Sequence, residues 1–147
     1  SLQELLPGEE YSVDVYVSGA GRAVAAVPRL RMKTDSGIAV TARTVDVPEV
    51  AQAAIAAASV IGLRYAANIQ FKRGGDGICK LLEINPRFPG TLPLTVAAGV
   101  DMPALLVSEM RGEALPPGPM PFREVMVARY WIEQFFDPAE WRRLESP

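Results

Sequence analysis

The sequence contains no histidine and a single cysteine, Cys79, and these two absences exclude several kinds of site. Without histidine the chain cannot carry out Ser-His-Asp or Cys-His catalysis, in which an imidazole acts as the general base. One cysteine cannot form a disulfide within the chain, and a zinc site built from cysteine and histidine is not expected either. We therefore expect Cys79 to be a small core residue.

The chain has no excess of basic over acidic residues, and it has few aromatic residues. The net charge is −2 and aromatic residues make up 7% of the chain, whereas surfaces that bind nucleic acid are basic and offer aromatic groups for stacking. No apolar run is long enough to span a membrane, and no signal peptide opens the sequence. We therefore expect no nucleic acid and no membrane as partners, and a cytoplasmic location.

The pattern of the 147 residues predicts one globular core built from short elements. Alternating and β-branched stretches predict strands over residues 11–17, 22–31, 39–46, 63–72, 78–84 and 124–131. Helical spacing and end signals predict helices over residues 48–62, 92–98, 102–111 and 138–143. This order predicts an α+β fold with a mainly antiparallel sheet and helices packed on one face.

A proline-rich linker at residues 116–119 divides the chain. We expect a subdomain over residues 1–117 and a C-terminal strand and helix extension over residues 118–147. Aromatic residues concentrate in this extension, and we expect them to pack onto the sheet. The alternative is a docking surface for further domains, or for a second copy of the chain in a homodimer.

The segment Leu82–Arg87 carries the strongest chemical signal. Glu83 and Asn85 lie two apart on a predicted strand, so their side chains project from the same face, and both present the oxygen that Mg²⁺ prefers. Pro86 ends the strand because it cannot donate a ladder hydrogen bond, and Arg87 then places a planar cation beside the oxygen pair. The pattern predicts metal-bound phosphate chemistry, although isolated polar residues are also typical of a half-exposed sheet.

A glycine-rich hairpin loop, Gly74–Gly77, joins this strand to the preceding one. In an antiparallel pair the numbers of facing residues add to a constant, and its parity decides which side chains share a face. An even sum would place Gln70 and Glu83 on opposite faces, but a loop centred within this segment gives an odd sum. We therefore expect a metal-binding set of Gln70, Glu83 and Asn85. The apolar neighbours of Glu83 also favour a partly buried carboxylate, and such charges are usually paired or metal-bound.

The stretch Asn68–Phe71, followed by Leu82–Arg87, resembles the ATP-grasp superfamily. The likeness is nearest to carbamoyl-phosphate synthase large subunits and related carboxylate-amine ligases, and it extends over roughly residues 1–112. It implies that Gln70, Glu83 and Asn85 bind the Mg²⁺ (or Mn²⁺) ions that bridge the phosphates of ATP. It also implies that Arg87 contacts the transferred phosphoryl group or the acylphosphate intermediate.

Two upstream segments extend the resemblance. Glu10 matches a family glutamate that hydrogen-bonds the ATP ribose, although an ordinary charged residue before a strand is an equally good interpretation. Arg31 and Lys33 match a basic stretch near the γ-phosphate. Because they lie two apart they are expected to share a face and converge on phosphate, the alternative being a solvated basic strand edge.

The resemblance implies the C-terminal part of an ATP- and Mg²⁺-dependent ligase. ATP would phosphorylate a small carboxylate or bicarbonate, and an amine or ammonia would attack the acylphosphate. Relatives also carry an N-terminal preATP-grasp domain and a lid domain, so we expect this chain to be inactive alone and to need these domains from the same or another chain. The alternative is a non-catalytic α+β binding or assembly module that keeps the ATP-grasp features as relics.

Overall fold

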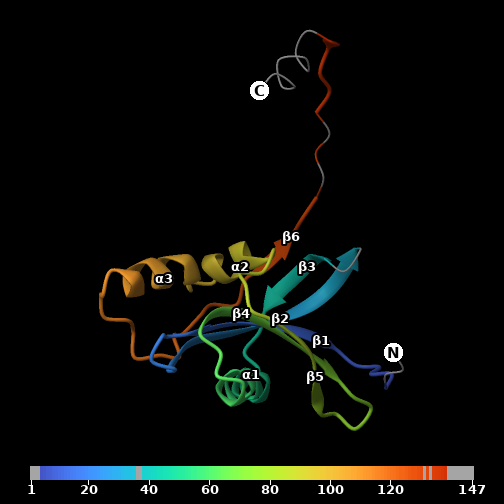
Figure 1. Ribbon diagram of the computed structural model, residues 1–147. Coiled ribbons are helices and arrows are strands. Elements are labelled where there is room, and N and C mark those ends of the chain that lie inside the picture. The colour runs from blue at the N-terminus through green and yellow to red at the C-terminus, as the bar shows by residue number, and fades with distance from the viewer. Residues whose placement is uncertain (1–3, 36–37, 131, 133, 139–147) are drawn as a thin grey trace.

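The computed structural model describes residues 4–35, 38–130, 132 and 134–138 (Figure 1). In this part of the chain six strands form one antiparallel sheet in the order β5-β4-β1-β2-β3-β6. The strands are β1 (Glu10–Val17), β2 (Ala23–Asp35), β3 (Ile38–Thr44), β4 (Tyr65–Arg73), β5 (Cys79–Asn85) and β6 (Met126–Ala128). The helices are α1 (Pro48–Val60), α2 (Leu92–Ala97) and α3 (Met102–Met110). The α+β class and the antiparallel sheet agree with the prediction.

β1 lies inside the sheet, and all of its residues from Tyr11 to Val17 are buried. Because successive strand side chains point to opposite faces, both faces of β1 must be covered. α1 packs against the face of Val13 and Val15, whereas α3 packs against the face of Tyr16. Figure 1 shows α1 below the sheet and α2 and α3 above it. The helices therefore cover both faces and not one face as predicted, because the even-numbered residues of β1 are buried as well.

α1 packs closely on the sheet because its buried side chains are small. Val50, Ala54 and Ala58 are at most 1% exposed and contact the core formed by β1 and β4. The helix begins with a proline, whose missing N–H is not needed in the first turn. It ends before Gly62, which has a φ of +67°, while the Leu63 amide donates to the Ala58 carbonyl at 2.8 Å. The sequence predicted both ends of this helix.

α3 is anchored at both of its ends. The side chain of Asp101 accepts a hydrogen bond from the Ala104 amide at 2.9 Å and caps the helix N-terminus. Near the other end, the Tyr16 hydroxyl donates to Glu109 Oε2 at 2.8 Å. Burial raises the pKa of Tyr16 above its ordinary value, and the hydrogen bond to Glu109 raises it further. The neutral phenol therefore links β1 to α3.

The segment after α3 returns to the sheet. Met120 and Phe122 pack against the core between α3 and the sheet, and β6 then pairs antiparallel with β3. The strand predicted over residues 124–131 is thus present but limited to three residues. The helix predicted over residues 138–143 lies almost entirely outside the described residues. Within the described part of the chain, no helix combines the length and apolar character needed to cross a membrane.

Candidate functional site

Two neighbouring strands bring the predicted metal-binding set together. β4 pairs with β5 so that Gln70 faces Glu83 and Asn68 faces Asn85. The facing numbers add to an odd value here, so the predicted hairpin register is confirmed at the site. Nearer the turn, a register shift between Gln70 and Phe71 changes the pairing. The sequence did not predict this irregularity.

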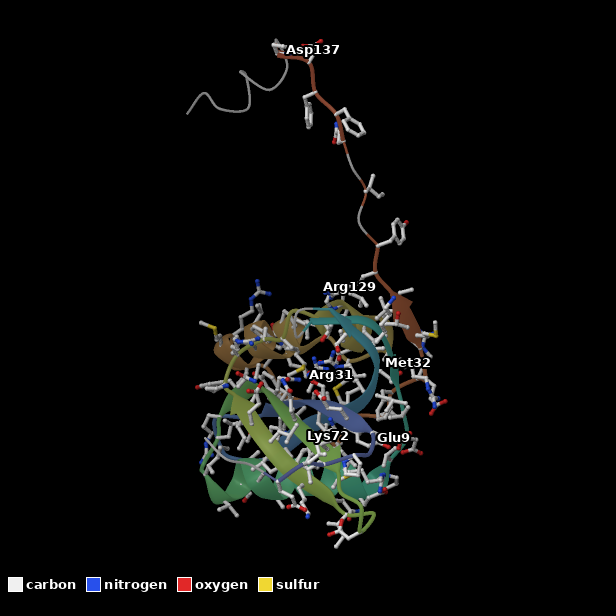
Figure 2. The ribbon with its side chains drawn as sticks, turned by 90° about the vertical axis from the view of Figure 1, so that its right-hand side faces the viewer. Glu9, Arg31, Met32, Lys72, Arg129 and Asp137 are labelled. Atoms are coloured by element: carbon white, nitrogen blue, oxygen red, sulfur yellow. The ribbon has the colours of Figure 1, made fainter. Side chains whose placement is uncertain are left out.

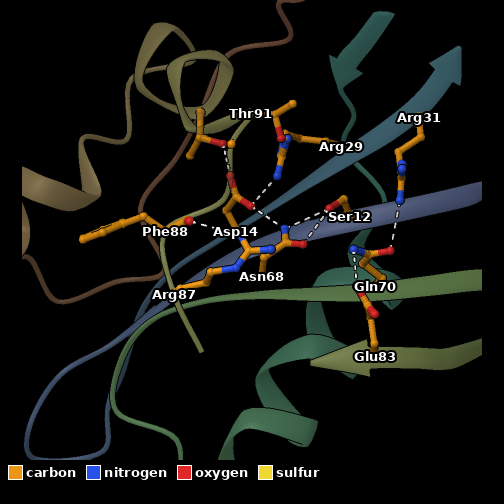
Figure 3. Close-up of polar contacts among 12 residues, drawn as sticks. Ser12, Asp14, Arg29, Arg31, Asn68, Gln70, Glu83, Arg87, Phe88 and Thr91 are labelled. Carbon is orange, nitrogen blue, oxygen red and sulfur yellow. Dashed lines mark hydrogen bonds and ion pairs between the residues drawn. The ribbon is translucent and has the colours of Figure 1, made fainter. Parts of the chain in front are cut away.

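The side chains of this set join a continuous hydrogen-bonded network, part of which is drawn in Figure 3. Glu83 Oε1 accepts from Gln70 Nε2 and from Asn85 Nδ2, each at 2.7 Å. Arg31 Nη1 donates to Gln70 Oε1 at 3.0 Å and to Glu10 Oε1 at 2.5 Å. We call these five residues, Glu10, Arg31, Gln70, Glu83 and Asn85, the polar row. It contains all of the predicted site residues except Arg87 and Lys33.

The position of β5 at the edge of the sheet leaves Glu83 exposed. Its neighbours Leu81 and Leu82 are 48% and 45% exposed, so they do not bury the carboxylate as the sequence argument assumed. The reason is that no other described element covers this edge of the sheet. The carboxylate is therefore open to a ligand from solvent.

Arg87 and Lys33 differ in their placement. Arg87 follows β5 after one residue, Pro86. It lines a cavity on the same face of the sheet as Gln70, where its Nη1 donates to the Phe88 carbonyl at 3.3 Å. Lys33 is exposed and does not line this cavity. Register irregularities flank Lys33 on β2, so the simple alternation that predicted a common face with Arg31 no longer applies.

A cavity of about 310 Å³ adjoins the polar row. Four arginines from different parts of the chain line it, and they are Arg29, Arg31, Arg87 and Arg129. Asn68, Gln70 and the loop at residues 89–91 contribute to the same wall, and no acidic side chain of the described residues lines it. Guanidinium groups bind carboxylate and phosphate through paired hydrogen bonds. The cavity is therefore suited to anions.

Sequence comparison agrees with this geometry. A family model described as "ATP-grasp in the biosynthetic pathway with Ter operon" matches residues 2–134. The chain belongs to this ATP-grasp family. No protein with a curated description matches the ATP-grasp chain by sequence.

Solved structures share the fold of this ATP-grasp chain. A biotin carboxylase from Campylobacter jejuni, in a β-γ-ATP complex, matches 78% of this chain and 28% of its own with a TM-score of 0.64 and 18% identity. The phosphoribosylaminoimidazole carboxylase ATPase subunit from Aquifex aeolicus matches with a TM-score of 0.64 and 16% sequence identity. The match covers 78% of this chain and 36% of that chain. N5-carboxyaminoimidazole synthetase from Staphylococcus aureus matches with a TM-score of 0.64 and 14% sequence identity. The match covers 78% of this chain and 32% of that chain. The chain thus spans 28–36% of the length of these relatives.

The oxygen atoms of the polar row fit a divalent metal. Glu83 offers a carboxylate, and Gln70 and Asn85 offer amide oxygens, while Mg²⁺ usually completes its shell with water and phosphate. Both amide nitrogens now donate to Glu83, and exchanging the nitrogen and oxygen of the Asn85 amide would present its oxygen instead. The same exchange at Gln70 would require it to give up the hydrogen bond that its Oε1 accepts from Arg31 Nη1. Among the described residues no three acidic or cysteine side chains form a metal-binding cluster. A metal here would therefore be shared with phosphate oxygens.

A buried ion pair beside the polar row was missed by sequence reasoning. Asp14 is fully buried, and its Oδ1 accepts from Arg29 Nη2 at 2.5 Å and from Asn68 Nδ2 at 2.7 Å. Its Oδ2 accepts from Thr95 Oγ1 at 2.5 Å, and the buried Arg29 also donates to Thr91 (Figure 3). Buried charges are tolerated when they are paired and hydrogen-bonded. This pair therefore fastens β1, β2, β4 and α2 together at the wall of the cavity.

One signal in the sequence could have indicated this pair. Asp14 and Arg29 are opposite charges set among mostly apolar residues of two consecutive predicted strands, and buried charges are usually paired. The tight turn at Ser18–Gly21 places Asp14 opposite Val27, which makes Arg29 a diagonal neighbour within side-chain reach.

Proposed function

We propose that this chain is the C-terminal part of the catalytic unit of an ATP- and Mg²⁺-dependent ligase that forms carbon–nitrogen bonds. The observation that carries the proposal is the polar row beside an arginine-lined cavity on the ATP-grasp fold. Fold relatives whose names describe carboxylases and a synthetase support the same class of reaction. We further propose that the preATP-grasp and lid parts of the unit come from the same or another polypeptide.

In this proposal the polar row binds the phosphates and the ribose of ATP. Gln70, Glu83 and Asn85 would hold Mg²⁺, which when bound neutralises charge on the β- and γ-phosphates. Glu10 would accept a hydrogen bond from the ribose, and the ion pair of 2.5 Å to Arg31 orients its carboxylate. Lys33, which does not line the cavity, would add only to the electrostatic attraction of phosphate.

The proposed reaction needs no protein nucleophile and no histidine. A carboxylate or bicarbonate oxygen attacks the γ-phosphorus of ATP while the bond from phosphorus to the ADP oxygen breaks. The nitrogen of an amine or of ammonia then attacks the acyl carbon, and inorganic phosphate leaves. Arg87 would position the reacting carboxylate and stabilise the charge on the transferred group. The glutamine at position 70 favours a carbamoyl-phosphate synthase-like member of this class.

Mn²⁺ binding tests the metal site. With inorganic phosphate present to supply the remaining oxygen ligands, substoichiometric Mn²⁺ should broaden the side-chain amide NMR signals of Gln70 and Asn85, because a paramagnetic ion relaxes nearby nuclei. Glu83→Gln should abolish this broadening, since it removes the carboxylate that both amides contact. Glu113→Gln removes an exposed carboxylate elsewhere and serves as the matched control. Equal broadening in the Glu83→Gln variant would mean that the metal binds elsewhere.

The catalytic part of the proposal is tested in an enzyme that also contains the preATP-grasp and lid domains. There Glu83→Gln should lower ATP-dependent turnover by about 10²-fold or more, the range found when a stabilising group at a reacting centre is removed. Undiminished turnover would favour the non-catalytic binding or assembly module instead.

A further inference from the structure

We propose that Arg129 selects acceptor carboxylates that carry a second anionic group. The inference rests on the proposed function, in which Arg87 holds the carboxylate that becomes phosphorylated. Arg129 was not singled out from the sequence, because nothing near it in the chain indicates a site. It follows β6, whereas the polar row comes from β1, β2, β4 and β5.

The backbone places Arg129 at the cavity. Its amide donates to the Val40 carbonyl at 2.8 Å, which extends the pairing of β3 with β6 by one residue. Val127 of β6 packs against the cluster that contains Leu94 of α2. Arg129 lies two residues further along the extended chain, so strand alternation places its side chain on the same side as that of Val127. Arg129 Nη2 accordingly donates to the Gly90 carbonyl at 2.5 Å in the cavity wall. Figure 2 shows Arg129 where the C-terminal segment leaves the sheet.

The charges around the cavity leave two arginines available. Arg29 and Arg31 each bind a carboxylate of the protein at 2.5 Å. Arg87 and Arg129 form no ion pair with the described residues, and each donates instead to a backbone carbonyl. A guanidinium has five N–H donors, so both retain donors for a ligand anion. Two such groups on one cavity would attract a ligand with two negative charges.

The volume of the cavity also suits a ligand that carries two negative charges. Its volume of about 310 Å³ corresponds to roughly ten water molecules in the liquid. Bicarbonate has four non-hydrogen atoms and would fill less than half of that space. The eight non-hydrogen atoms of succinate, a short carbon chain that ends in a second carboxylate, would occupy most of it. A short dicarboxylate therefore fits both the volume and the charges better than bicarbonate does.

Binding of mono- and dicarboxylates to the chain tests this inference. Succinate and glutarate should bind several-fold more tightly than butyrate or bicarbonate in calorimetric or NMR titrations. Arg129→Gln should weaken binding of the preferred dicarboxylate about tenfold, the effect of losing one charge-assisted hydrogen-bonded contact, and should change butyrate binding less than twofold. Arg123→Gln is the matched control, because Arg123 donates from the same segment to the Ala97 carbonyl at 2.9 Å but does not line the cavity.

Three results would overturn the inference. These are equal affinity for butyrate and glutarate, an equal effect of the variants at Arg129 and Arg123, and no detectable dicarboxylate binding at tens of millimolar. The Mn²⁺ experiment separates this failure from failure of the proposed function. If Mn²⁺ still broadens the NMR signals of Gln70 and Asn85 while mono- and dicarboxylates bind equally well, only the proposed role of Arg129 is refuted.

Discussion

Replacing Asp14 by asparagine should strongly destabilise the fold. Asp14 is fully buried and accepts hydrogen bonds from Arg29, Asn68 and Thr95. Asparagine has nearly the same size, but it removes the charge and places an N–H₂ group where one carboxylate oxygen accepted. Arg29, which is 1% exposed, would remain buried without its counter-charge.

The expected cost follows from this burial. Removing one partner of a buried ion pair costs about 3–5 kcal/mol, because the remaining charge stays desolvated but loses its compensation. We therefore expect Asp14→Asn to lower the free energy of unfolding by about 4 kcal/mol, on the order of 10³ in the folding equilibrium. A domain of ordinary stability has about 5–15 kcal/mol in total, so the variant should be close to unfolding.

Urea unfolding followed by far-UV circular dichroism measures this loss. Asp46→Asn makes the same chemical change at an exposed position and should alter the free energy of unfolding by less than about 0.5 kcal/mol. Combining Asp14→Asn with Arg29→Gln should cost less than the sum of the two single variants by about 1–3 kcal/mol, because the two residues interact directly.

A loss below about 1 kcal/mol for Asp14→Asn, or additive behaviour of the two variants, would refute the reasoning. Salt provides a second check. Since the pair is buried, the stability difference between the original chain and Asp14→Asn should change little between low and high ionic strength. A difference that shrinks steeply with salt would mean that Asp14 is solvent-exposed.

Three further predictions concern other parts of the fold. Burial raises the pKa of Tyr16, so as the pH rises the unfolded chain loses the phenol proton before the folded chain does. The free energy of unfolding should therefore fall as the pH rises above about 10. Tyr16→Phe should remove that pH dependence. Burial also raises the pKa of Cys79, so iodoacetamide should modify it more slowly in the native chain than in urea. Gly118 has a φ of +50°, and a Cβ there would lie 2.6 Å from the Val24 backbone. Gly118→Ala should therefore cost about 1 kcal/mol or more in urea unfolding, and more than Gly112→Ala, where a Cβ has open space.

Local patterns predicted the elements and part of the site. The proline at the start of α1 and Gly62 after its end are short-range signals, and both boundaries agree with the structure. Hairpin parity placed Gln70 opposite Glu83 because strand alternation and turn length are local properties. The same reasoning did not hold at Lys33, since irregularities in a strand pairing depend on the partner strand as well.

The sequence by itself determined which side chains could bind phosphate and metal, and in what order they occur along the sheet. Alternation within a strand and the geometry of a tight turn suffice for that. Only the tertiary structure decided that β5 is an edge strand with an exposed Glu83, that helices cover both faces, and that Asp14 pairs with Arg29. It also brought Arg129 to the cavity. These features depend on which distant elements lie side by side, and the period of a single strand or helix carries no information about its neighbours.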